Sequence, residues 1–240
     1  MTSISKNDSL KPFIVRRSEI VPCKTAFIDA RSPGSDQKEN YCLIGGGVAE
    51  NPSQVVHINT PHGFDVGAAR QPTGCKNSHH SHDTEEVFVV HKGQWKFTWG
   101  EDGSDGEVVL DSGDTISIPT QLFRGFENVG DRNGFLFSVL GHLPNGTPGR
   151  VTWAPYVFDE AKKHGLVLLQ DGRLIDTHAG QSVPDDQPLY QPVCGKELEA
   201  FRTLAMEDMV KNVSRNADLL SQGAGGLTNG NGVYEFAVIG

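Results

Sequence analysis

Short segments of strand-forming residues, separated by turn signals, recur along the chain from about residue 41 to residue 143. Nine such segments stand in this stretch: YCLIG, SQVVHIN, FDVGAA, EVFVVHKG, QWKFTW, GEVVL, DTISIP, FRGFEN and GFLFSVLG. Many short strands at close spacing are typical of an antiparallel β-sandwich or β-barrel. The sequence therefore predicts an all-β fold, and its 28 Gly and 13 Pro residues agree with many turns.

The segments on either side of this stretch divide the chain further. Residues 1–38 are polar and predict an extended N-terminal arm, and residues 39–150 hold the predicted barrel. Residues 151–195 are irregular and predict a loop segment that covers the barrel. Residues 196–240 predict a helix followed by a tail, so we expect one β-rich core with accessory segments.

Two helical segments are predicted in the second half of the chain. A helical turn is expected at 157–164, where Gly165 can end it. Residues 196–211 predict one amphipathic helix, because their apolar side chains recur at helical spacing: Leu198, Phe201, Ala205 and Met209. The last residues, FAVIG at 236–240, resemble YCLIG at 41–45, which leaves open that a second barrel begins there.

The charge and the apolar pattern argue against several kinds of partner. Thirty acidic residues against 21 basic ones give a formal net charge of −9, and no Lys/Arg run exceeds two, so we expect no nucleic-acid partner. No stretch approaches the ~18 apolar residues that cross a bilayer, and the N-terminus lacks the apolar region of a signal peptide. We therefore expect a cytoplasmic protein, without a membrane partner, whose four cysteines are free thiols.

One predicted strand carries three aromatic residues, Trp95, Phe97 and Trp99, which alternate with Lys96 and Thr98. Successive side chains of a strand point to opposite faces, so the three rings share one face. Such a face is expected in the packed core. A wall on which a ligand stacks is the alternative.

The densest group of potential ligands is His80, His82 and Glu86. Two histidines at positions i and i+2 of a strand point to the same face, and the carboxylate follows four residues later. Two imidazoles and one carboxylate suit a divalent transition metal and leave coordination positions open, as in non-haem iron oxygenases. We expect one metal ion here, with Fe(II) favoured and Mn, Ni, Cu or Zn as alternatives. A polar patch on a strand is the other interpretation.

The spacing around these residues resembles the first motif of the cupin superfamily, the RmlC-like β-barrels. That motif has glycine, five residues, His, one residue, His, three residues, Glu, six residues and glycine. The chain matches every position from Gly74 to Gly93. The resemblance implies an antiparallel jelly-roll β-barrel over about residues 40–143, and a homodimer, since cupins commonly pair.

The family's second motif is matched only in part. It has glycine, five residues, Pro, one residue, glycine, two residues, His, three residues and Asn, and Gly113, Pro119 and Asn128 agree with it. Gln121 stands in place of the second glycine, and Arg124 in place of the histidine. In the family that histidine is usually the fourth metal ligand, and a protonated arginine does not coordinate a metal. The resemblance therefore implies at most three ligands here.

Three roles are open for Arg124. Its planar, two-pronged guanidinium suits a substrate carboxylate or enolate at the open face of the metal, which would make it the substrate-orienting catalytic residue. It can instead pair with Glu86 and abolish metal binding. The third role is that of a solvated surface residue.

Four further histidines lie near the motifs. His57 is a candidate acid or base that can reach the pocket from a neighbouring strand, with a structural role as the alternative. His79 is expected on the strand face opposite His80, unless a bulge exchanges the two. His91 is expected at the surface. His142 can replace the missing ligand only if its strand end turns inward.

Two functions from different classes fit this site. The first is a mononuclear metal-dependent oxidoreductase of the dioxygenase type, which acts on a small anionic or enolisable organic substrate; a cupin isomerase or lyase is a variant of this hypothesis. The second is a cupin that binds or stores a small molecule without catalysis, and the altered second motif is the argument for it.

Overall fold

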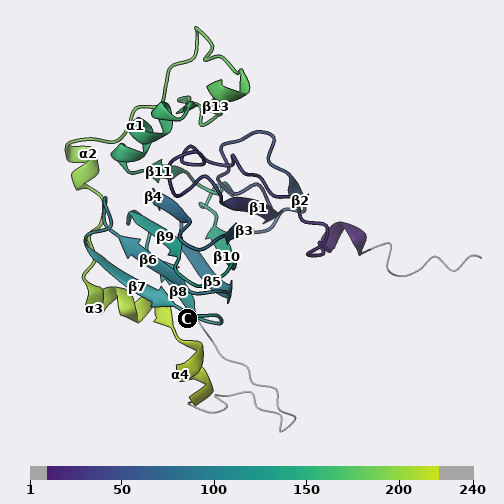
Figure 1. Ribbon diagram of the computed structural model, residues 1–240, viewed down its shortest axis with the longest axis vertical. Coiled ribbons are helices and arrows are strands. Elements are labelled where there is room, and N and C mark those ends of the chain that lie inside the picture. Colours follow the sequence, from purple (N-terminus) through teal and green to yellow (C-terminus); the bar gives the residue numbers. More distant parts are fainter. Residues whose placement is uncertain (1–9, 222–240) are drawn as a thin grey trace, which may run out of the picture.

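Two β-sheets form the body of the computed structural model, which describes residues 10–221 (Figure 1). The larger sheet has the strand order β14-β8-β5-β10-β3-β1-β2. Its strands are β14 (Val213–Ser214), β8 (Thr115–Ile118), β5 (Glu86–Lys92), β10 (Gly134–Gly141), β3 (Phe64–Gln71), β1 (Glu39–Ile44) and β2 (Val56–Ile58). The smaller sheet has the order β11-β4-β9-β6-β7. Its strands are β11 (Val151–Trp153), β4 (Lys76–His82), β9 (Arg124–Asn128), β6 (Trp95–Trp99) and β7 (Gly106–Leu110).

The predicted all-β jelly-roll class is confirmed. All nine segments that the sequence indicated are strands or contain one, and the paired strands run antiparallel except β1 and β2, which are parallel. Within residues 10–221 the strand pairing forms two facing sheets, and no ladder joins them into one closed barrel. No helix among these residues has the length and apolar character needed to cross a bilayer.

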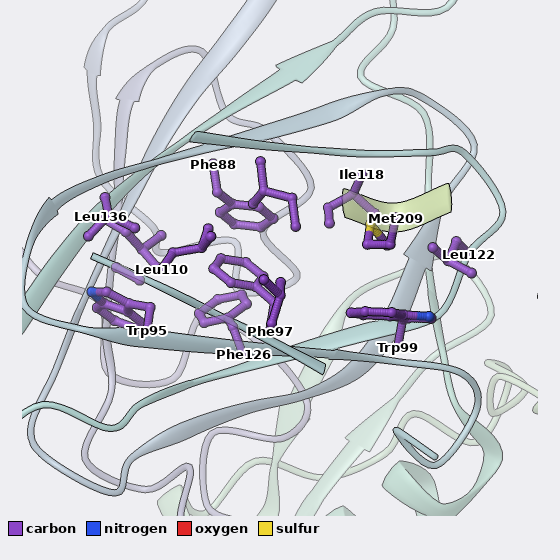
Figure 2. Close-up of a cluster of buried hydrophobic side chains, with 14 residues drawn as sticks. Phe88, Trp95, Phe97, Trp99, Leu110, Ile118, Leu122, Phe126, Leu136 and Met209 are labelled. Carbon is purple, nitrogen blue, oxygen red and sulfur yellow. The ribbon is translucent and has the colours of Figure 1, made fainter. Parts of the chain in front are cut away.

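A cluster of apolar side chains fills the space between the two sheets (Figure 2). Trp95, Phe97 and Trp99 of β6 are fully buried in it, as the alternation along that strand predicts. The larger sheet contributes Phe88 and Leu136 from the opposite side. The core interpretation of the three aromatic residues is therefore confirmed.

The predicted helix over 196–211 is wrong. This segment forms two single-turn helices, α2 (Lys196–Glu199) and α3 (Met206–Met209), with an extended connection between them. In that connection Arg202 N–H donates to Gln121 O at 2.7 Å, and Trp99 Nε1 donates to Leu204 O at 2.7 Å. These tertiary bonds use backbone groups that a continuous helix would pair internally, and they bring Met209 into the core.

The segment 151–195, expected to be irregular, carries more structure than predicted. It supplies strand β11, helix α1 (Pro155–Lys163) and the two-stranded sheet of β12 (Leu166–Leu168) and β13 (Leu174–Asp176). The predicted helical turn thus exists, and Gly165 follows it with a positive φ of 78°. A second apolar cluster joins α1 and this sheet to the body of the molecule. The segment covers one end of the sandwich, opposite α3 (Figure 1).

The described part of the expected N-terminal arm, residues 10–38, contains more than extended chain. It includes the short helix η1 (Lys11–Phe13), and its stretch 26–38 folds into the molecule, with Ile28, Asp29 and Lys38 almost fully buried. The remaining short elements are η2 (Thr177–Ala179), η3 (Val210–Asn212) and α4 (Asn216–Ser221). The C-terminal FAVIG segment, for which a second barrel was suggested, lies outside the described residues.

Candidate metal centre

The three predicted ligands come from two strands that are consecutive in the chain but belong to different sheets. His80 and His82 lie on β4 of the smaller sheet, and Glu86 is the first residue of β5 in the larger sheet. One ligand atom from each of the three lies within 4.8 Å of the others. Their exposed fractions are 5%, 4% and 7%, so the group is buried between the sheets. This brings together the set that the sequence predicted.

Backbone carbonyls set the orientation of both imidazoles. His80 Nδ1 lies 2.8 Å from Ser78 O, and His82 Nδ1 lies 3.4 Å from Arg150 O. Asn77 Nδ2 also lies 3.3 Å from His80 Nδ1, but the contact with Ser78 O is shorter. A carbonyl oxygen only accepts, so we assign the proton of each ring to Nδ1, which leaves each Nε2 with its lone pair. Burial lowers the pKa of both histidines well below its usual value, and the charge of Arg124 lowers it further. Both rings are therefore neutral, which is the form that binds metals.

Arg124 forms a buried ion pair with the third ligand. It is 1% exposed, its Nη2 donates to Glu86 Oε2, and its Nη1 donates to His80 O at 2.8 Å. Burial raises the pKa of Glu86, while the charge and the hydrogen bond of Arg124 act in the opposite direction. The guanidinium thus neutralises the carboxylate at the position where the family places a fourth ligand.

Of the three roles left open for Arg124 by the sequence, the structure has the pairing with Glu86. Two of its nitrogens are engaged by the protein, and Arg124 is absent from the described residues that line the neighbouring cavity. A side chain held in this way orients Glu86, and its predicted role toward a substrate stays a prediction.

A cavity between the sheets reaches the three ligands. Its volume is about 90 Å³, and one water molecule needs about 10–15 Å³ by the same measure, so there is room for a small organic molecule. The lining is mainly apolar and aromatic, and its polar part includes Asn40, Gln54, Asp65, Asn77 and the ligand group. Among the residues 10–221 that line it there is no lysine or arginine.

The other histidines have protein partners. His57 accepts a hydrogen bond from Val21 N–H at Nε2, at 2.9 Å, and its Nδ1 donates to Cys42 O at 2.7 Å. It does not line the cavity. Both of its nitrogens tie the arm to β1, which agrees with the structural alternative, and the acid or base role of His57 stays a prediction.

His79 and His142 also differ from metal ligands in their contacts. His79 lies on the outer side of β4, where its two nitrogens meet Tyr156 Oη and Thr98 Oγ1, both at 2.9 Å. His142 Nε2 pairs with Asp65 Oδ2 at 2.8 Å and does not join the ligand group. His91 is exposed, as expected.

One neighbour of the ligands was missed by the sequence reasoning. The ring of Trp153 on β11 packs against the ring of His80, with centroids 5.0 Å apart, and its Nε1 donates to Glu50 Oε1 at 2.6 Å. These contacts arise because β11 pairs with β4 at Trp153 and His80. No local pattern signals a pairing between residues more than 70 positions apart.

Comparison with known proteins places this site in a family. Residues 69–140, which include the three ligands and Arg124, match the model of the cupin domain. The chain carries a cupin domain. A search of curated proteins found no match. The cupin domain accounts for the facing sheets and for the position of the ligand group at the start of β5 and the end of β4.

Among solved structures, vicilin from hazelnut (Corylus avellana) is similar, with 13% identity and a TM-score of 0.42 over 60% of this chain and 36% of that one. Oxalate decarboxylase from Lactobacillus farciminis has 13% identity and a TM-score of 0.41 over 59% and 36%. An RmlC-like cupin from Shewanella frigidimarina has 13% identity and a TM-score of 0.36 over 52% and 86%. The chain thus matches little more than a third of the vicilin and of the decarboxylase.

Proposed function

We propose that this cavity is the active site of a metal-dependent cupin enzyme of the dioxygenase type, which acts on a small organic substrate. The observation that carries the proposal is the orientation of the imidazoles. Because Ser78 O and Arg150 O accept hydrogen bonds from the Nδ1–H groups, the Nε2 lone pairs of His80 and His82 are free beside the Glu86 carboxylate. This is the donor set that divalent transition metals bind with open positions left over.

The fit of a metal rests on these three residues and on the shape of the cavity. A divalent ion, with Fe(II) favoured, would be held by His80, His82 and Glu86, and when bound it would supply Lewis acidity and redox chemistry. The apolar lining excludes water from the ligand group and offers a packing surface for an organic substrate.

The charge of Arg124 shapes the choice of substrate. Glu86 and Arg124 cancel each other, so an ion bound here would keep its full charge of +2. A substrate anion would be attracted to that charge, because the described lining of the cavity offers no cationic side chain that could bind the anion in place of the metal. We therefore propose that the substrate is a small anionic or enolisable molecule and that the metal, not Arg124, binds it.

A second function has one specific observation in its favour. Arg124 already occupies one Glu86 oxygen, and a carboxylate neutralised by a buried guanidinium is a weaker metal ligand than a free one. A cupin that binds a small molecule without metal and without catalysis would be compatible with this pair. Metal content distinguishes the two functions.

The test is metal analysis of protein that is purified without added metal. We expect about one equivalent of a transition metal in the parent, and replacement of His80 or His82 by Ala should remove most of it, because two ligands seldom hold a divalent ion tightly. His79→Ala is the matched control, since that side chain lies on the outer side of the same strand. A metal-free parent that also takes up no metal would favour the binding function.

Arg124→His gives the finer test of the enzyme. The variant restores the family's fourth ligand and removes a cation next to the ion, so it should bind metal at least as tightly as the parent. Turnover of a β-diketone or phenolic acid, followed by oxygen uptake, should fall, because a coordination position is filled and Glu86 loses its partner. Equal turnover in the parent and the variant would exclude a role of Arg124 in the reaction.

A further inference from the structure

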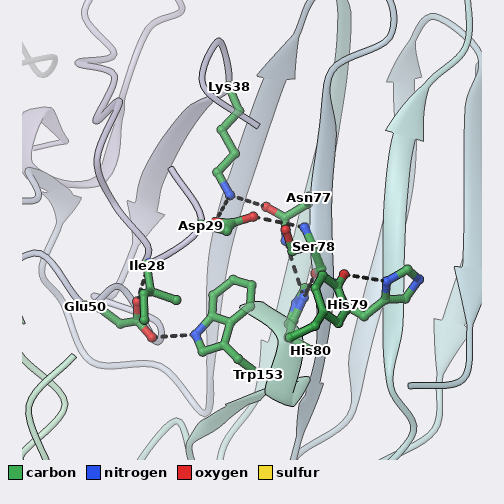
Figure 3. Close-up of polar contacts among 10 residues, drawn as sticks. Ile28, Asp29, Lys38, Glu50, Asn77, Ser78, His79, His80 and Trp153 are labelled. Carbon is green, nitrogen blue, oxygen red and sulfur yellow. Dashed lines mark hydrogen bonds and ion pairs between the residues drawn. The ribbon is translucent and has the colours of Figure 1, made fainter. Parts of the chain in front are cut away.

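The strand that carries the histidine ligands is irregular just before them. Its pairing with β9 changes register between Asn77 and His80. Within this bulge the Ser78 N–H points away from the sheet and donates to Asp29 Oδ2 at 2.9 Å. Ser78 is also the residue whose carbonyl holds His80 Nδ1 at 2.8 Å. A side chain of the N-terminal segment therefore binds the backbone that orients a ligand (Figure 3).

Lys38 completes this contact from the same segment. Its Nζ donates to Asp29 Oδ1 and, at 2.8 Å, to Asn77 Oδ1, and the side chains of Lys38 and Asp29 are both 0% exposed. The bulge thus has two attachments, one at Asn77 and one at Ser78. Bulges next to functional sites commonly redirect a side chain and need local support.

The energetics argue that the pair serves more than stability. Burying two charges costs desolvation that their attraction only partly offsets, and apolar replacements of such pairs are often no less stable. A second ion pair of the N-terminal segment joins Arg31 to Asp176 of β13, is more exposed at 29% and 14%, and makes no hydrogen bond to β4. The fully buried pair is the one that contacts the bulge.

We propose that Asp29 is a positioning residue for the metal centre: it accepts the Ser78 N–H, holds the bulge, and so keeps His80 with its proton on Nδ1 and its Nε2 directed at the ligand group. Lys38 balances the buried charge and fixes Asn77. The inference rests on the proposed metal-binding function, and it assigns to the N-terminal segment, outside the matched cupin domain, a part in the site.

Two double variants isolate the accepting oxygen. Lys38→Met with Asp29→Asn removes both charges but keeps a side-chain oxygen for the Ser78 N–H. Lys38→Met with Asp29→Ala removes both charges and the oxygen. Neither leaves an unpaired buried charge, so both are expected to fold, and thermal unfolding checks this. Arg31→Met is the control for loss of an ion pair elsewhere in the same segment.

The first measurement is Zn²⁺ affinity, with zinc as a probe that is not redox-active. The Asn double variant and Arg31→Met should bind within a few fold of the parent. The Ala double variant should bind about 10–100-fold more weakly, which is the usual effect of removing a group that supports a metal ligand. Equal affinity of the Asn and Ala double variants would overturn the proposal.

The second measurement needs no metal and therefore separates this inference from the proposed function. ¹⁵N NMR of the metal-free protein reports which nitrogen of His80 carries the proton. We expect one tautomer, protonated at Nδ1, in the parent and the Asn double variant, and a mixture in the Ala double variant. A single unchanged tautomer in the Ala double variant would refute the positioning role, whereas a parent with this tautomer but no zinc affinity would refute only the metal-binding function.

Discussion

Two adjoining regions between the sheets bury very different side chains. Beside α3, at what we call the apolar end, the core consists of apolar groups, among them Trp99 and Met209, both 0% exposed. The region that we call the charged end begins at the next strand, where Arg124 of β9 pairs directly with Trp99 of β6. Here Glu86 and Arg124 are almost as deeply buried, with 7% and 1% exposed. Apolar burial stabilises a fold in proportion to area, whereas buried charges have a desolvation cost. We infer that one end maintains the fold and that the other retains its charges for chemistry.

The largest effect is expected in the apolar cluster. Trp95→Ala should lower the free energy of unfolding by about 3–5 kcal/mol, because it leaves a large cavity and removes the hydrogen bond to Lys92 O. Trp95 pairs with Asn128, at the opposite end of β6 from the Trp99–Arg124 pair, so metal bound per folded molecule should not change. Urea unfolding and metal analysis measure the two quantities. A loss of metal without a loss of stability would contradict the division between the two ends.

Arg124→Met tests the charged end. Without metal the variant should be less stable than the parent by about 3 kcal/mol, because Glu86 is left buried without its partner. When both proteins are saturated with Zn²⁺ the difference should shrink, since the ion then offsets the carboxylate. Trp95→Ala, the control, should stay equally destabilised with and without zinc. An Arg124→Met deficit that zinc leaves unchanged would mean that Glu86 does not bind the ion.

A pH effect of comparable size is expected from Glu50. Burial raises the pKa of Glu50 to about 8. The folded protein then holds a proton that the unfolded chain releases, so stability should decline as pH rises from about 5 to about 8, by about 4 kcal/mol. Glu50→Gln cannot ionise and should show a flatter curve. Parallel slopes in parent and variant, from urea unfolding at each pH, would exclude Glu50 as the cause.

The smallest effect on stability is expected at the turn that precedes β9. Gln121 has a φ of 58°, in the left-handed region that favours glycine, and it stands where the family motif has glycine. Gln121→Gly should raise the free energy of unfolding by about 0.5–1 kcal/mol, because relief of backbone strain exceeds the entropy cost of glycine. Gln121→Ala, which keeps the strain, should show no gain. A gain as large in the Ala variant would point to the side chain and not the backbone.

Local sequence patterns were sufficient to predict much of the fold and the three residues at the centre of the site. The alternation of Trp95, Phe97 and Trp99 predicted their burial, and the i, i+2 spacing of His80 and His82 predicted a shared face. Both rules depend only on strand geometry, which neighbouring residues determine among themselves.

What the sequence could not predict depends on contacts between distant residues. The helix expected over 196–211 was lost to hydrogen bonds with Gln121 and Trp99. Asp29 lies 49 positions from Ser78, so no periodicity connects them. The resemblance to the family left three roles open for Arg124, and its pairing with Glu86 of the other sheet is a contact that no local pattern predicts.

The segment that closes the apolar end has a consequence for synthesis of the protein. Strands β3 to β10 are complete at Gly141, but Leu204 and Met209, which contact Trp99 or complete its cluster, are translated more than 60 residues later. Throughout that interval the growing chain can pair its sheets while the base of their core stays open to water. A nascent chain at this stage would be a substrate for chaperones that recognise exposed aromatic residues, and it would acquire protection from proteases only when Met209 leaves the ribosome.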